Sequence, residues 1–195
     1  MTKHRPNISI MDTIYKRSSV RSYSPERLSR TTIRTLLAAA VRAPTAVHLE
    51  PWVFAIVQDT SVLKHLSERA KPLFLEEVHR AHLDRGGHSL DMFASSDFNM
   101  FYNAGTLIII CGKPLGPFVV ADCWLAAANL ILAACSIGLG TCVIGSAVPA
   151  LNSPDVKAEL GIADELSAIA PIIVGVPAGE TQPTARKEPE ILFWK

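Results

Sequence analysis

The segment 119–137 restricts the fold most, because it has the pattern of a long helix that is apolar on almost every side and ends at Gly138. Such a helix is typical of a protein core or a subunit interface, although its length would also allow a membrane span. Asp122, Asn129 and Ser136 recur every seven residues and so share one face. Asp and Asn would be costly on an isolated span. We therefore expect the central helix of a soluble protein, and a membrane-anchored protein is the weakest alternative.

Other segments supply both helices and strands around this helix. Ser29 to Val41 has an apolar face at helical spacing and a serine N-cap, and Thr60 or Ser61 should cap a further helix. Three apolar runs rich in β-forming residues predict buried strands. These runs are Trp52–Val57, Gly105–Cys111 and Ile169–Val176. Shorter helices are expected after Asp12 and from Ser153 to Gly161. Without internal repeats or a linker, residues 1–195 form a single predicted domain.

Composition excludes several classes of protein. Hydrophobic residues make up 49% of the 195 residues and charged residues 19%, which indicates a well-buried globular protein. A net charge of +1 gives no reason to expect nucleic acid or an anionic membrane as a partner. The N-terminus lacks the apolar stretch of a signal peptide, so we expect a cytoplasmic location. The cysteines have no Cys-x-x-Cys spacing, and buried free thiols are the expectation for Cys111, Cys123, Cys135 and Cys142.

The stretch from Arg42 to Trp52 lies between a predicted helix and a predicted strand. Pro44 and Pro51 restrict the backbone at both of its ends. Its polar side chains include Thr45 and His48. Taken alone it favours a stiff connector, but ordered loops at strand ends are also where small-molecule sites occur.

Two further stretches carry groups that suit a phosphorylated ligand. Arg17-Ser-Ser-Val-Arg21 offers two forked guanidinium groups and two hydroxyls that can surround a phosphate, although a solvated basic patch is the more common origin of such a sequence. Gly138-Leu-Gly-Thr-Cys-Val-Ile-Gly145 lets the backbone come close to a ligand, but it follows a helix and so is not the dinucleotide fingerprint.

Residues 71–100 give the weakest pattern. Pro72 suits the first turn of a helix that carries Leu73, Leu75 and Val78. His79, His82 and His88 near Asp84 raise the possibility of a metal site, but nothing completes a ligand set, so no metal is expected and a polar loop or lid is the default.

The chain ends in the apolar tetrapeptide Ile191-Leu-Phe-Trp194. Together with the apolar 119–137 helix, it suggests a large apolar interface with a second subunit.

These motifs, taken in order, resemble the nitroreductase family of flavin enzymes. The resemblance rests on Arg17-Ser-Ser-Val-Arg21 with Tyr23, on Ala43-Pro-Thr-Ala-x-His-x-Glu-Pro-Trp52, on Gly138 to Gly145, and on Arg186-Lys187. It implies an α+β fold with a central, mostly antiparallel sheet wrapped by helices, in an intertwined homodimer with FMN at the interface. It also implies oxidation of NAD(P)H and reduction of nitroaromatic, quinone or similar small acceptors by a ping-pong mechanism.

The resemblance also assigns cofactor contacts. Arg17, Ser18 and Ser19 would hold the phosphate and ribityl chain, and Arg21 would lie near N1 and the C2 carbonyl of the flavin. The segment that would reach FMN from the other subunit comprises Pro44, Thr45, Ala46 and His48. Backbone beside N5 would come from Val143, Ile144 and Gly145, and Arg186 and Lys187 would clamp the phosphate. No catalytic residue is assigned, because hydride transfer to the flavin needs no protein acid or base.

The chain departs from the family pattern at His48 and Glu50, where Asn and Gln are more usual. Glu50 cannot donate a hydrogen bond as Gln does, and an ionised Glu50 near a flavin would oppose added negative charge. The alternative function is therefore a flavin-binding protein without turnover, acting as a sensor or store.

Overall fold

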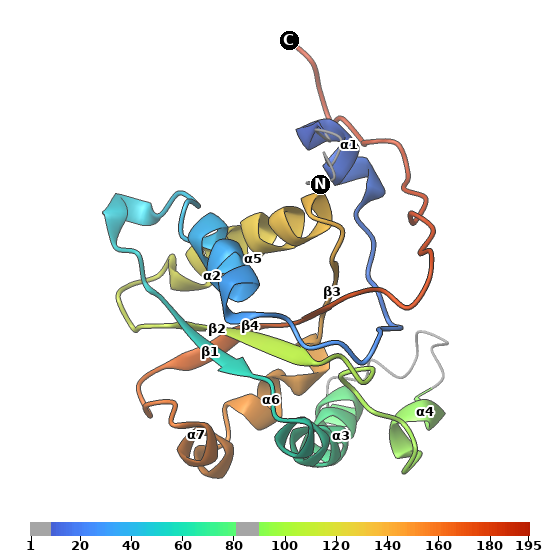
Figure 1. The fold of residues 1–195 in the computed structure, drawn as a ribbon. Helices are drawn as coiled ribbons and strands as arrows, with labels where there is room; N and C mark the ends of the chain where they lie inside the picture. Colours follow the sequence, from blue (N-terminus) through green and yellow to red (C-terminus); the bar gives the residue numbers. More distant parts are fainter. Residues whose placement is uncertain (1–8, 81–89) are drawn as a thin grey trace.

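The computed structural model describes residues 9–80 and 90–195, which are built around an antiparallel sheet (Figure 1). The sheet has four strands in the order β1-β2-β4-β3. Their bounds are β1 Trp52–Val57, β2 Thr106–Gly112, β3 Gly140–Val143 and β4 Ser167–Gly175. The α+β class with an antiparallel sheet is as the sequence predicts.

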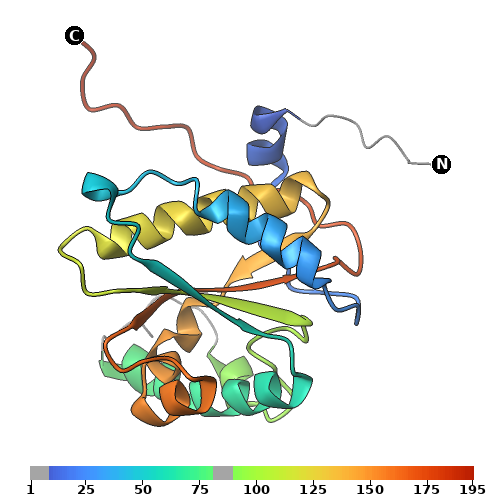
Figure 2. The ribbon, with the colours of Figure 1, turned by 60° about the vertical axis from the view of Figure 1, so that its left-hand side comes forward.

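Helices cover both faces of the sheet, so the domain has three layers (Figure 2). On one face lie α2 (Arg30–Ala40) and α5 (Val119–Ser136). On the other lie α3 (Thr60–Arg80), α4 (Asp91–Ala94), α6 (Val148–Leu151) and α7 (Pro154–Leu160). Alternate residues of β2 enter the two cores, since Ile108 and Ile110 pack with α2 and α5 while Leu107 and Ile109 pack with α3 and α6.

The caps of two helices differ from the predicted ones. α1 (Ile10–Lys16) begins after Ser9, whose hydroxyl accepts a hydrogen bond from the Asp12 amide at 3.0 Å. Asp12 therefore lies in the first turn and is not the cap. At the start of α3, the Asp59 carboxylate accepts from the amides of Ser61 and Val62, so the cap is Asp59 and not the predicted Thr60 or Ser61. The Ser29 cap of α2 is confirmed.

Pro72 does not begin a new helix, so the sequence prediction was wrong at this position. α3 continues from Thr60 to Arg80 with Pro72 inside it. Pro72 lies on the exposed side of the helix, where water can bind the backbone carbonyl that the proline leaves free. Leu63, Leu66 and Val78 hold the buried side against the core on either side of the proline.

The long helix α5 has two different sides. Its buried side carries Asp122, Cys123, Ala126, Ala127, Leu130 and Ala134. The opposite side exposes Val120, Trp124 and Leu125. α5 is the one helix in the described residues with the length and hydropathy of a membrane span. Its buried side packs on the sheet and on α2, which is the position expected of a core helix.

β1 is an edge strand, whereas the sequence predicted a buried one. Its end residues Trp52 and Val57 are buried, but the residues between them are partly or fully exposed, with Ile56 at 39%. The glycine-rich region 138–145, for which the sequence predicted no strand, contains the edge strand β3 on the opposite side of the sheet.

Candidate functional site

The segment Arg17–Arg21 lies beside β3. Ser19 pairs with Thr141 in an isolated parallel bridge, and the Val20 amide donates to the Thr141 carbonyl at 2.9 Å. A Cβ at Gly140 would come within 2.7 Å of the Val20 side chain, so this close approach requires glycine at position 140. Two sequence motifs that are about 120 residues apart are thus joined at one strand edge.

This segment is extended, and that separates its two arginines. At about 3.3 Å per residue, the backbones of Arg17 and Arg21 lie roughly 13 Å apart. The prediction that both arginines surround a single phosphate stays a prediction, because two long side chains can converge over that distance. The separation also suits the assignment from the family resemblance, in which Arg17 serves the phosphate end of a long ligand and Arg21 serves the other end.

The Arg17 end borders a hollow of about 180 Å³. Lys16, Arg17, Ser18 and Cys135 line it together with the start of β3 and the chain after β4. Burial raises the pKa of the Cys135 thiol, while the nearby positive charges of Arg17 and Lys16 lower it. The buried Ser18 and half-buried Arg17 give this end hydroxyl and guanidinium donors in a basic setting.

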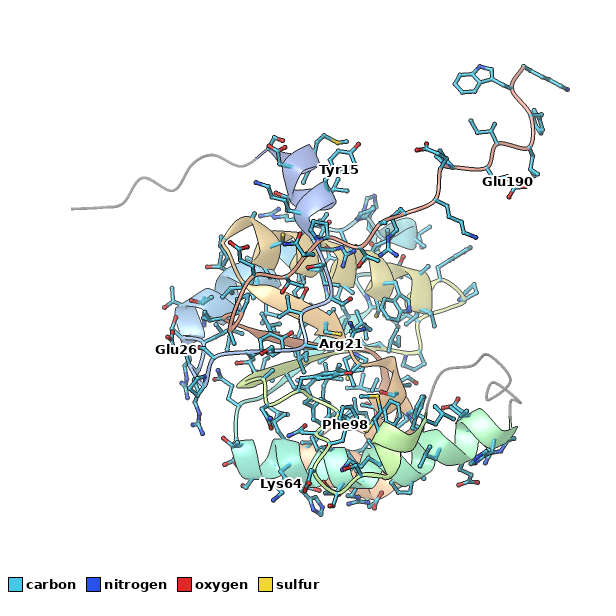
Figure 3. The ribbon with its side chains drawn as sticks, turned by 90° about the vertical axis from the view of Figure 1, so that its right-hand side faces the viewer. Tyr15, Arg21, Glu26, Lys64, Phe98 and Glu190 are labelled. Carbon is cyan, nitrogen blue, oxygen red and sulfur yellow. The ribbon has the colours of Figure 1, made fainter. Side chains whose placement is uncertain are left out.

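The Arg21 end is bordered by an aromatic cluster, which is seen with Arg21 and Phe98 in Figure 3. The Arg21 guanidinium lies over the Tyr102 ring, 5.9 Å from its centroid, within cation–π range. The Tyr102 ring contacts the Phe98 ring, which contacts Phe93, and Phe93 in turn contacts Phe74. These partly buried rings pack against the core below the sheet, so Tyr102 presents one fixed surface to the Arg21 charge.

Cys142 lies near Arg21 and Ser19, a neighbour that the sequence did not reveal. Burial raises the pKa of its thiol, and the Arg21 charge and a hydrogen bond with Ser19 oppose that rise. The thiol is therefore neutral near physiological pH, as expected of a buried packing residue.

Gly145 presents open backbone at the end of β3. A Cβ at this position would meet no atom within 4 Å, which leaves room for a ligand. By contrast, the Ile144 amide donates to the Pro171 carbonyl at 2.9 Å. The family resemblance places backbone of Val143 to Gly145 beside the flavin N5. The Ile144 amide already has an acceptor within the chain, whereas the Gly145 amide has none among the described residues.

The loop between Pro44 and Pro51 has an unusual backbone. It contains the short 3₁₀ turn η1 (Ala46–His48), and three of its non-glycine residues have left-handed φ values: Val47 46°, His48 57° and Glu50 46°. The buried Asp122 of α5 holds the loop, since its Oδ1 accepts a hydrogen bond from the Ala46 amide at 3.2 Å. Pro44 and His48 are exposed, and Thr45 and Ala46 are half-buried.

Within one chain, this loop and the Arg17–Arg21 segment lie at opposite ends of α5 (Figures 1 and 2). Ala46 contacts Asp122 near the start of the helix, while Cys135 Sγ donates to the Thr13 carbonyl near its end. Those two contacts are about 20 Å apart along the helix axis. The structure therefore unites the predicted residues Arg17 to Arg21 with Val143 to Gly145, but leaves Pro44 to His48 apart from them.

The predicted contacts Arg186 and Lys187 lie on the C-terminal tail, which leaves the body of the domain beside α1 (Figure 3). Every residue from Ala178 to Lys195 is exposed. In the part of the chain that the structure describes, Arg186 and Lys187 form no hydrogen bond or ion pair with the rest of the protein. The single chain does not bring them to the site.

Comparison with known proteins fits this geometry. The model of the Nitroreductase family matches residues 14–176. The chain belongs to the nitroreductase family. An NADH dehydrogenase/NAD(P)H nitroreductase of Archaeoglobus fulgidus is 28% identical over 172 residues, covering 86% of this chain and 84% of that protein.

A solved structure also resembles this nitroreductase-family chain. The crystal structure of a nitroreductase with bound FMN from Bacteroides fragilis has a TM-score of 0.81 at 26% identity, covering 96% of this chain and 99% of that one. A second branch is represented by an iodotyrosine deiodinase of Thermotoga neapolitana, which is 25% identical over 139 residues, covering 68% of this chain and 71% of that protein.

Three features near these segments were missed by the sequence reasoning: Tyr102, Cys142 and the loop contact of Asp122. Asp122 did carry a signal, since it shares a face of α5 with Asn129. Among residues 9–80 and 90–195, no group of three or more His, Cys, Asp or Glu could hold a metal ion. His82, Asp84 and His88 lie outside the described residues.

Proposed function

We propose that this chain is an FMN-dependent oxidoreductase that uses NAD(P)H to reduce a small acceptor such as a nitroaromatic or a quinone. The observation that carries the proposal is the segment Arg17–Arg21 beside β3, which we call the strip. One end of the strip offers the Arg17 guanidinium and the Ser18 hydroxyl, and the other end offers the Arg21 guanidinium. A long ligand with an anionic phosphate at one end fits this arrangement. The bound FMN of the Bacteroides fragilis relative supports the same assignment.

Each residue of the strip has a separate task in this proposal. Arg17 and the Ser18 and Ser19 hydroxyls would hold the phosphate and ribityl chain. Arg21 would hold the pyrimidine edge of the flavin, where its positive charge favours the reduced form. The open Gly145 amide would donate to N5. When bound, FMN would accept hydride from NAD(P)H and pass the electrons to the acceptor in a ping-pong sequence.

We propose that the working form is a homodimer with shared sites. The loop with Thr45 and His48 contacts α5 about 20 Å along the helix from Cys135, which lines the Arg17 hollow. This separation favours a site in which Arg17 and the loop come from different chains. In a dimer, the loop of one subunit can complete the strip of the other. The exposed apolar residues Val120, Trp124 and Leu125 on α5 would then be covered by the partner.

The tail supports an intertwined dimer. The open edge of β1 is bordered by hollows of about 450 Å³ and 360 Å³ on its two sides. The tail residues Ile191 and Phe193 alternate with Leu192 and Trp194, so a partner's tail laid along β1 would send side chains to both hollows. Arg30 and Arg34 beside one hollow complement the tail's acidic residues, which are Glu188 and Glu190.

The first test is the cofactor and its reduction. We expect the purified protein to carry FMN, identified by mass spectrometry of the released cofactor, and NADH or NADPH to bleach its absorption under anaerobic conditions. FAD or no flavin would contradict the proposal. A yellow protein that neither nucleotide reduces would favour the alternative of a flavin store or sensor.

The second test is the acceptor. The oxidation of NAD(P)H should be followed with a nitroaromatic, a quinone and iodotyrosine, because relatives named nitroreductase and iodotyrosine deiodinase both match this chain. Faster turnover with iodotyrosine than with the other two would assign the chain to reductive deiodination instead. Size-exclusion chromatography with light scattering tests the dimer, and a flavin-loaded monomer would refute the shared site.

A further inference from the structure

Asp122 is a buried carboxylate with an unusual position. It is 4% exposed in the first turn of α5 and forms no salt bridge in the described part of the chain. Its Oδ1 accepts the Ala46 amide at 3.2 Å across a sequence separation of 76 residues. A buried charge of this kind normally destabilises a protein unless hydrogen bonds and a helix N-terminus compensate it. Its presence therefore suggests a task beyond packing.

The segment that Asp122 holds has a backbone conformation that costs free energy. Val47, His48 and Glu50 all have left-handed φ values, which cost free energy for residues with a Cβ. Inside the loop, the Leu49 amide donates a backbone hydrogen bond to the Ala46 carbonyl at 3.2 Å. The Ala46 carbonyl thus accepts a hydrogen bond from the loop, and the Ala46 amide donates one to Asp122 of α5. Ala46 therefore connects the left-handed turn to α5.

A second polar residue of α5 fixes the start of the same segment. Asn129 Nδ2 donates to the Ala39 carbonyl, at the C-terminal end of α2, at 3.3 Å. Asp122 and Asn129 are about 10.5 Å apart along the helix. The two side chains therefore hold the chain at Ala39, where it leaves α2, and at Ala46, where the turn begins.

We propose that Asp122 is a positioning residue that fixes the turn Ala46–Glu50 and so presents Thr45 and His48 to the FMN of the partner subunit. This inference rests on the proposed function, because it assigns the turn to a flavin. The carboxylate is 4% exposed, and it holds the turn through the hydrogen bond that it accepts from the Ala46 amide. It does not itself touch the cofactor.

The contact can be broken from either side. Asp122→Ala removes the acceptor, whereas Asp122→Asn keeps an oxygen at the same place and serves as the conservative rescue. Ala46→Pro removes the donor alone, and the local backbone suits proline, because Thr45 has φ −133° and ψ 151° and Ala46 opens a helical turn. Asp155→Ala is the matched control, since Asp155 is an exposed aspartate in the first turn of α7.

Two measurements test the proposal on the full-length protein. The first is hydrogen exchange of the amides at positions 47–50 in flavin-free protein, which should quicken roughly tenfold or more in Asp122→Ala and Ala46→Pro. The second is the dissociation constant for added FMN, which should rise by a similar factor. The double variant should be no worse than either single variant, because both remove one interaction. Asp122→Asn and Asp155→Ala should stay near wild type.

The outcomes distinguish positioning of the turn from general support of the fold. Unchanged exchange at 47–50 in both variants would overturn the role of Asp122 in shaping the turn. Quicker exchange with unchanged FMN affinity would overturn the link to the flavin. A loss of FMN affinity with equal quickening throughout the domain would show a merely structural role. Failure of the proposed function itself would appear in the wild type, which would then bind no FMN.

Discussion

The loop 44–51 and the C-terminal tail both carry proposed contacts to FMN, but they differ in how far contacts within their own chain fix them. The loop is held by the buried Asp122 in a strained, specific shape. The tail beyond Ala178 is exposed along its whole length, and Arg186 has no partner within the described residues. In the proposed dimer, the loop would be organised before assembly, while the tail would gain its position from the partner subunit. This difference predicts which variants affect the dimer and which affect the flavin.

Removal of residues 185–195 should have the largest effect. The tail has no fold of its own to lose, so the body of the domain should remain folded while dimer and flavin are lost together. Circular dichroism, light scattering and flavin absorbance measure the three properties. Two more selective variants separate the dimer from the flavin. Replacement of all four residues 191–194 by serine should abolish the dimer. The double variant Arg186→Ala, Lys187→Ala should weaken FMN binding and leave the dimer intact. A flavin-loaded dimer without the tail would show that the loop side suffices.

Arg17→Ala should weaken FMN binding by about 1.5–3 kcal/mol, the range for a hydrogen bond to a charged group. Arg17 belongs to the region fixed by its own chain, so the dimer should persist when FMN is in excess. Titration of the flavin-free protein with FMN measures the effect. Lys64→Ala is the control, since Lys64 is an exposed cation on α3, on the other face of the sheet. An unchanged dissociation constant for Arg17→Ala would contradict its assignment to the phosphate.

Glu50→Gln should raise the midpoint potential of the flavin, on the order of tens of millivolts. Its carboxylate lies on the loop that we place against FMN, where negative charge disfavours the reduced form. Glu190→Gln on the tail makes the same chemical change away from the flavin ring, and its potential should match that of the wild type. Spectroelectrochemical titration distinguishes the two. Equal potentials for wild type and Glu50→Gln would place the loop away from the flavin.

The smallest expected effect concerns backbone strain. Glu50 has a φ of 46°, so Glu50→Gly should stabilise the flavin-free protein by up to about 1 kcal/mol through relief of the left-handed conformation. Glu50→Gln separates this gain from the loss of charge. Glu190→Gly should have no effect on stability, because no contact within residues 9–80 and 90–195 holds Glu190. Denaturant unfolding measures the difference. A destabilised Glu50→Gly would mean that the side chain, and not only the backbone, holds the loop.

The sequence predicted most elements because their signals are local. Ser29 as a cap, the periodic apolar face of α2, the continuous apolar runs of β2 and β4, and the glycine after α5 all depend on residues within a few positions of one another. The errors have the same origin. Pro72 was expected to start a helix, but the burial of Leu66 and Val78 on either side of it outweighs the cost of one lost hydrogen bond.

By itself, the sequence determined the family and the chemical groups of the site, since the guanidinium groups, hydroxyls and glycines of its motifs occur in a specific order. Only the tertiary structure decided where those groups lie. It joined Ser19 to Thr141, made β1 an edge, left Gly145 as the available amide, and separated the loop from Arg17 by about 20 Å of helix. The physical reason is that caps and periodicity act over a few residues, while distances between segments are set by how helices and strands pack.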